Sequence, residues 1–143
     1  MITLALLNQM NLEKVAGLTK DRDFFWEEAP LQKNGQPASG VWLVTRGGDS
    51  SMSPKGLNLK TTVDFYVAFA NKSKTEVIHR EILNWIIANP TICQLSGSVD
   101  GTTYSYSFSN VRIRPIQTPQ LDGVTENGLI VKVASALLVY DED

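Results

Sequence analysis

The chain has 143 residues, of which 43% are hydrophobic and 20% charged, and its formal net charge is −2. This composition is typical of a folded globular protein rather than a disordered chain, and we expect a single domain over residues 1–143. The near-neutral charge argues against binding to nucleic acid through a broad basic surface. Cys93 is the only cysteine, so no disulfide can form within the chain.

The opening segment, residues 3–18, predicts a helix that Asn8 and Asn11 shorten or break, because asparagine is a weak helix former. Its apolar start is too short to cross a bilayer and lacks the basic beginning of a signal peptide, which indicates a cytosolic protein. The charged residues 20–23 are interpreted as a solvated turn.

Two short strands are predicted next. The first begins with residues 24–26 and is closed by Ala29 and Pro30, the second covers 40–46, and a turn-rich segment separates them. The polar segment 47–56 has the length of a functional or disordered loop. It is not a nucleotide-binding loop, because the GxxxxGK[ST] pattern is missing and no helix follows. We expect a loop that orders against a partner, and its candidate contact residues are Arg46, Asp49, Met52 and Lys55.

The clearest local pattern lies in the middle of the chain. Apolar and more polar side chains alternate over residues 61–69, which predicts a half-buried strand. Ser73 and Glu76 have the spacing of a capping box, so a helix is expected over about 74–88. Pro90 ends it, because proline disfavours helical geometry in the preceding residue.

This central helix carries apolar residues on two faces. The first stripe is formed by Ile78, Ile82, Trp85 and Ile86. A helix that is apolar on more than one face is buried on more than one side. The second stripe is formed by Leu83 and Ile87, which lie beside Glu76 and Arg80. It is covered either by a loop or the N-terminal helix of the same chain, or by another subunit. In the second case the candidate interface residues are Leu83, Ile87, Glu76 and Arg80.

Residues 93–99 and 102–114 are expected to pair as a hairpin around an Asp-Gly turn. Aromatic residues occupy even positions up to Phe108, whereas apolar residues occupy odd positions from Val111 onward. A shift of one residue turns every following side chain to the other face of a sheet. The pattern therefore predicts a bulge or a break in the strand at 109–110.

The last strand is predicted over 129–140 and is apolar at both odd and even positions. Such a strand is typically covered on both of its faces.

The sequence contains few residues in arrangements that could carry out catalysis. His79 is the only histidine, and one histidine with one cysteine cannot make an ordinary zinc site or an HExxH motif. No nucleophile motif accompanies His79. Glu27 and Glu28 are adjacent, and adjacent strand residues point to opposite faces. We therefore expect no enzymatic activity, no metal and no cofactor.

The predicted elements follow a recognisable order: a short N-terminal helix, an aromatic stretch with a proline at 24–30, a strand ending in paired glycines at 41–48, an alternating strand at 62–67, an amphipathic helix, a Glu-Asn-Gly turn at 126–128 and a hydrophobic strand to Tyr140. Over nearly the whole chain this order resembles the small tail-terminator proteins, also called tail-completion or minor tail proteins, of bacteriophages with long non-contractile tails. The long polar loop at 47–56 and the serine- and tyrosine-rich segment 102–109 depart from the family pattern.

The resemblance implies an α+β fold, with a mostly antiparallel sheet packed by the central helix at about 74–88 and an N-terminal helix. It also implies a ring of copies, usually a hexamer, at the head-proximal end of the tail tube. Such a ring stops polymerisation of the tail-tube protein and provides a docking surface for head-completion proteins. DNA passes through its lumen without specific binding. The implied location is the virion tail, and the host cytoplasm during assembly, without membrane attachment.

Two other classes of function remain open from the sequence. One is another head–tail joining protein or a tail-tube subunit. The other is a small ligand-binding domain or enzyme that uses the 47–56 loop as a lid.

Overall fold

The computed structural model describes residues 2–28, 31, 35, 38–48, 57–99, 104–117, 123–125 and 128–142. Within these residues the chain forms two α-helices, one short 3-10 turn and seven strands. In chain order they are α1 (Ile2–Leu12), η1 (Val15–Gly17), β1 (Phe24–Trp26), β2 (Gly40–Gly48), β3 (Leu59–Phe69), α2 (Lys72–Ala88), β4 (Thr91–Val99), β5 (Tyr104–Ile116), β6 (Gly123–Val124) and β7 (Ile130–Glu142).

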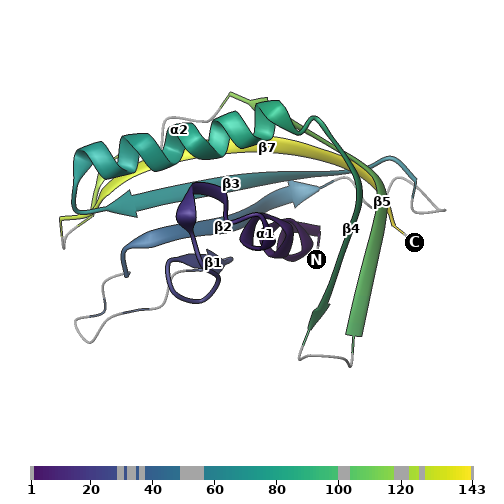
Figure 1. Ribbon diagram of the computed structural model, residues 1–143, viewed down its shortest axis with the longest axis horizontal. Coiled ribbons are helices and arrows are strands. Elements are labelled where there is room, and N and C mark those ends of the chain that lie inside the picture. The colour runs from purple at the N-terminus through teal and green to yellow at the C-terminus, as the bar shows by residue number, and fades with distance from the viewer. Residues whose placement is uncertain are drawn as a thin grey trace.

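The strands form one sheet in the order β1-β2-β3-β7-β5-β4, and β6 pairs with the first residues of β7. The pair β1–β2 is parallel, whereas the other strand pairs among the described residues are antiparallel. The α+β class and the mostly antiparallel sheet expected from the sequence are therefore confirmed. Figure 1 shows α2 lying along β7 and β3, while β4 and β5 run down one side of the molecule.

Both helices pack on the same face of the sheet and share one hydrophobic core with it. Alternate residues of β3, among them Val63 and Phe65, point into this core, as the period of two predicted. Helix α2 contributes Ile78, Ile82 and Ile86, which lie one turn apart on its inner side.

The start of α2 differs from the prediction. Its N-cap is Asn71, whose side-chain Oδ1 accepts a hydrogen bond from the Lys74 backbone N at 3.1 Å. The expected capping box of Ser73 with Glu76 does not form, because the helix begins earlier and Glu76 pairs with Lys132 instead. The end at Ala88, just before Asn89 and Pro90, agrees with the prediction.

Helix α1 spans Ile2–Leu12 and ends one residue after Asn11, so it is shorter than the predicted segment 3–18, as the asparagines indicated. Every residue from Ile2 to Leu7 is buried, so packing compensates for the weak helix propensity. Asn11 Oδ1 accepts a hydrogen bond from the Lys20 backbone N at 2.8 Å and so ties the end of α1 to the following turn. Neither helix in the described part of the chain is long and apolar enough to cross a membrane.

The bulge predicted in the second arm of the hairpin is confirmed. The register between β5 and β7 shifts by one residue between Ser109 and Arg112, and Asn110 has a positive φ of 51°. The shift lets both Phe108 and Val111 point into the core. The turn that joins β4 to β5 lies outside the described residues.

Strand β7 is apolar on both faces, as expected, but the helices cover only one of them. Ala134, Ala136 and Leu138 lie on the helix-covered face and are buried. On the opposite face, Leu137 and Val139 remain half-buried. Val133 and Ser135 on the same face are buried, so the prediction of cover on both sides is confirmed for the first half of β7 and not for Leu137 and Val139.

Candidate subunit and partner interfaces

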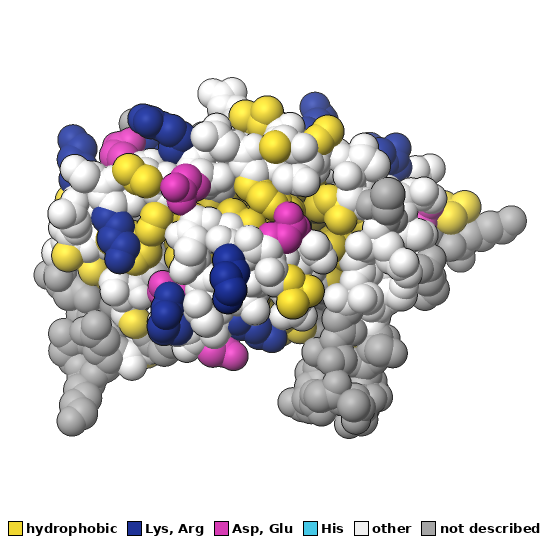
Figure 2. Space-filling model, in the orientation of Figure 1, with side chains coloured by type: hydrophobic (Ala, Val, Ile, Leu, Met, Phe, Trp, Pro, Cys, Tyr) yellow, Lys and Arg dark blue, Asp and Glu magenta, His cyan; other side chains and the backbone are white. Residues whose placement is uncertain are grey.

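The outer side of α2 carries part of the predicted interface stripe. Ile87 is 63% exposed and Arg80 is exposed as well, whereas Leu83 is half-buried against the core. Val77, which the sequence analysis did not include, is 51% exposed and lies one turn before Arg80 on the same side of the helix. Figure 2 shows hydrophobic side chains along α2 at the top of the molecule, with Lys and Arg side chains around them.

Glu76, the fourth residue of the predicted stripe, is held by its own chain. Its Oε2 lies 2.9 Å from Lys132 Nζ on β7. The hydrogen bond from Lys132 and its charge lower the pKa of Glu76. The exposed residues on this side of the helix are Val77, Arg80 and Ile87, which we call the α2 stripe.

Of the four predicted loop residues, Arg46 is described, whereas Asp49, Met52 and Lys55 lie outside the described residues. Arg46 sits at a register irregularity of β2, between Thr45 and Gly47. A bulge of this kind re-aims the side chain at the irregular position. The Arg46 Nε lies 3.0 Å from Asp64 Oδ2, so Arg46 is held in an ion pair on the sheet.

The sheet face opposite the helices has its own side-chain arrangement, which we call the open sheet face. Asp64 of β3 is 1% exposed and its Oδ1 accepts a hydrogen bond from Ser135 Oγ at 2.5 Å. Beside it, the rings of Trp42 and Tyr66 stack with their centroids 5.6 Å apart and an interplanar angle of 1°. These two aromatic residues are half-buried and give the face an apolar part.

The part of the open sheet face formed by β5 and β7 contains a hollow of about 310 Å³. Leu137 and Val139 contribute apolar lining, and Arg112 and Arg114 from β5 line it as well. Both arginines are exposed. This combination of apolar and cationic groups suits contact with an apolar protein surface that carries carboxylates.

A polar network lies beside this hollow. Asp141 accepts hydrogen bonds from Asn110 Nδ2 and from the Asn58 backbone N, each at 2.8 Å. Arg112 Nη2 donates to Asn58 Oδ1 at 3.1 Å. The hydrogen bonds from Asn110 and Asn58 lower the pKa of Asp141. The network ties the start of β3, the bulge of β5 and the end of β7 together.

In the described part of the chain, no group of three or more His, Cys, Asp or Glu side chains is arranged to hold a metal ion. His79, the single histidine, lies on α2 with its Nε2 3.2 Å from the Val133 backbone O. This hydrogen bond joins α2 to β7.

No protein-family model and no curated protein matches the chain.

The sequence analysis found the α2 stripe only in part and did not find the open sheet face. Ile87 and Arg80 followed from helical spacing, whereas Val77 was not included, although its spacing of three residues from Arg80 places it on the same side of the helix. The open sheet face could have been found from the alternation over β3, because Asp64 and Tyr66 lie on the face opposite Val63 and Phe65. A carboxylate in the middle of a strand indicates a partner cation, but the sequence did not show that the cation is Arg46.

Proposed function

We propose that the protein is a tail terminator of a long-tailed, non-contractile bacteriophage, a structural ring protein rather than an enzyme. Copies of the chain close into a ring, with six as the expected number, on the head-proximal end of the tail tube. The ring ends polymerisation of the tube and provides the docking surface for a head-completion protein. In this proposal the protein is located in the virion tail.

The observation that supports a ring is the presence of two different surfaces on opposite sides of one subunit. The α2 stripe lies on the helix side, and the open sheet face lies on the other side. In a ring each subunit contacts its neighbour through two unlike patches, and such a heterologous contact is self-limiting when the rotation closes. Apolar residues on both surfaces supply the area that such contacts bury.

The charges of the two surfaces are compatible with side-by-side assembly. Arg80 lies in the α2 stripe, and Arg112 and Arg114 line the hollow of the open sheet face. Carboxylates on the neighbouring subunit, the tube or the head-completion protein would complement them. The net charge of −2 suits a ring through which DNA passes, because a basic lumen would retain the phosphate backbone.

Purified protein added to purified tail-tube subunits of the same phage tests the capping function. We expect tubes assembled with the protein to be shorter than tubes assembled without it, with a ring at one end in electron micrographs. A tube subunit would behave differently, because it would polymerise alone or lengthen the tubes. Tubes of unchanged length, with no protein at their ends, would contradict the proposal.

A further inference from the structure

Strand β4 (Thr91–Val99) is the last strand on its side of the sheet. It pairs with β5 along one edge, and no strand within the described residues pairs with its other edge. In an antiparallel pair, every second residue turns its backbone N–H and C=O away from the partner strand. The outer edge of β4 therefore presents a row of backbone donors and acceptors that another extended strand can satisfy.

This edge lacks the features by which proteins usually prevent pairing with another chain. Short length, charged side chains, prolines and bulges normally protect an edge strand. Strand β4 has nine residues, and none of them is charged or a proline. Its register with β5 is constant along the strand. On the exposed side, Gln94 and Ser96 are uncharged.

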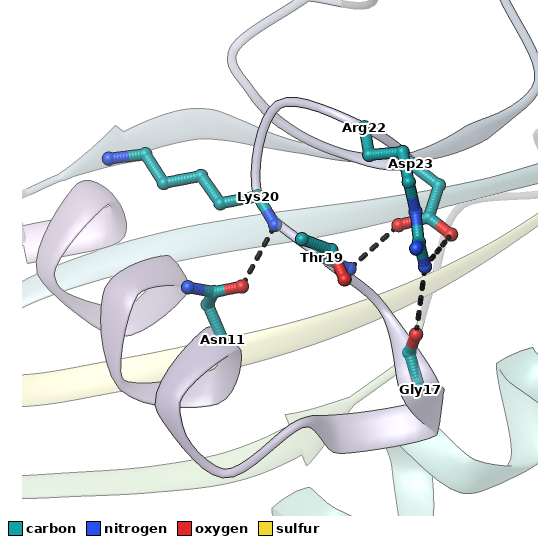
Figure 3. A network of polar contacts seen from close by, with 6 residues as sticks. All are labelled: Asn11, Gly17, Thr19, Lys20, Arg22 and Asp23. Carbon is teal, nitrogen blue, oxygen red and sulfur yellow. Dashed lines mark hydrogen bonds and ion pairs between the residues drawn. The ribbon is translucent and has the colours of Figure 1, made fainter.

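The opposite edge of the sheet is closed. Strand β1 has only three residues, and the Phe24 carbonyl at its start accepts a hydrogen bond from the Asp21 backbone N at 2.9 Å. The turn before it is fixed by Asp23, whose Oδ1 accepts from the Thr19 backbone N at 2.7 Å. Figure 3 shows this network, in which Arg22 also reaches the Gly17 carbonyl. The solvated turn expected at residues 20–23 thus has a structural role, and β4 of another copy cannot add to β1.

We propose that β4 pairs with β4 of a second copy of this chain and joins two sheets across a two-fold axis. A partner that pairs with the open edge of β4 must be an extended strand. Of the two edge strands of this sheet, β1 is short and β4 is long, so β4 of a second copy is the edge strand that fits. A two-fold axis makes the two strands antiparallel and satisfies both open edges in one contact. The pairing concerns the subunit in solution and does not depend on the proposed tail function.

The middle residue of β4 sets the register. Pairing centred on Leu95 overlaps all nine residues of each strand. Gln94 then lies opposite Ser96 of the second copy, and Ser96 lies opposite its Gln94. Directly opposed side chains in antiparallel strands are close enough to interact, and like charges there are destabilising. The native residues at these positions bring no charges together, which favours self-pairing.

Charge substitutions at the two exposed positions test this contact. We expect the wild-type protein to have twice the 15.8 kDa chain mass in light scattering at high micromolar concentration. The variant Gln94→Lys, Ser96→Lys and the variant Gln94→Glu, Ser96→Glu should each be monomeric. An equal mixture of the two variants should restore dimers, and native mass spectrometry should show them to be mixed.

A matched control carries the same added charge elsewhere. Ser39 and Ser73 are exposed and lie outside β4, so Ser39→Lys, Ser73→Lys should leave the dimer intact. Circular dichroism and thermal melting check that all variants fold. A wild-type monomer, or a dimer that the β4 charges leave intact, would overturn the proposal. Loss of the dimer in a lysine variant that still forms rings would support the β4 pairing as a contact separate from the ring contacts.

Discussion

Asp64 shows how one residue organises the open sheet face. Its carboxylate is almost fully buried, and it is satisfied by the Arg46 guanidinium at 3.0 Å and the Ser135 hydroxyl at 2.5 Å. Removing one member of such a group leaves the others without a partner, and this costs more than the intact group contributes. The three side chains also join neighbouring strands, since Arg46 comes from β2 and Ser135 from β7.

We expect Asp64→Ala to lower the free energy of unfolding by about 2 to 3 kcal/mol, because the Arg46 charge and the Ser135 hydroxyl lose their acceptor. Asp64→Asn should cost less, since an amide oxygen can still accept the Ser135 hydrogen bond. Urea denaturation measures both. A loss below about 0.5 kcal/mol for Asp64→Ala would be typical of a surface site and would contradict the packing described here.

Asp141 makes folding stability depend on pH. Hydrogen bonds from Asn110 and Asn58 hold its folded-state pKa below the ordinary value of 3.8, so the folded state favours the carboxylate. The resulting stabilisation is present above the unfolded-state pKa and is lost as the pH falls through the folded-state pKa. We expect Asp141→Asn to reduce the loss of stability between neutral pH and about pH 3. Urea denaturation at several pH values tests this, and an unchanged pH profile would contradict it.

At the scale of elements, α2 is fixed by its cap and by its buried stripe. Asn71 satisfies the Lys74 backbone N, whereas Ser73 lies inside the first turn and is exposed. We expect Asn71→Ala to lower the free energy of unfolding by about 1 kcal/mol. Ser73→Ala should change it by only a few tenths, because alanine is favoured inside a helix. Equal losses in thermal or urea denaturation would instead place the cap at Ser73.

The sequence predicted those elements whose signals are local. The end of α2 followed from Pro90, and the bulge at Asn110 followed from a change in the phase of the apolar residues. The N-cap was misplaced because Ser73 with Glu76 has a favourable spacing, while Lys132, more than fifty residues away, binds Glu76. The parallel pairing of β1 with β2 depends on tertiary contacts and has no local signal.

At the scale of the whole molecule, helices cover one face of the sheet and the other face carries the Trp42–Tyr66 stack, a hollow and two arginines. The sequence indicated that β7 is apolar on both sides, and on the second side Val133 is buried whereas Leu137 and Val139 are half-buried. Half-burial of Leu137 and Val139 is expected where another subunit completes the burial. Exposure of Ile87 gives the same indication on the helix side.

Substitution of the α2 stripe tests whether it is a contact between subunits. We expect Arg80→Glu, Ile87→Glu to leave the monomer folded, because both side chains are exposed, and to abolish ring formation in electron micrographs. Leu83→Glu should instead lower the stability of the monomer, since Leu83 packs against the core. Leu12→Glu is the matched control, because Leu12 is an exposed apolar residue outside the stripe. Rings that persist in the double variant would exclude this surface from the contact.

The most direct test of the proposed function is electron microscopy of a lysate from the parent phage with an early stop codon in this gene. We expect overlong tails that are detached from filled heads, because nothing ends polymerisation of the tube. Headless tails of normal length would place the protein in the neck instead. Intact virions would contradict a structural role in the tail.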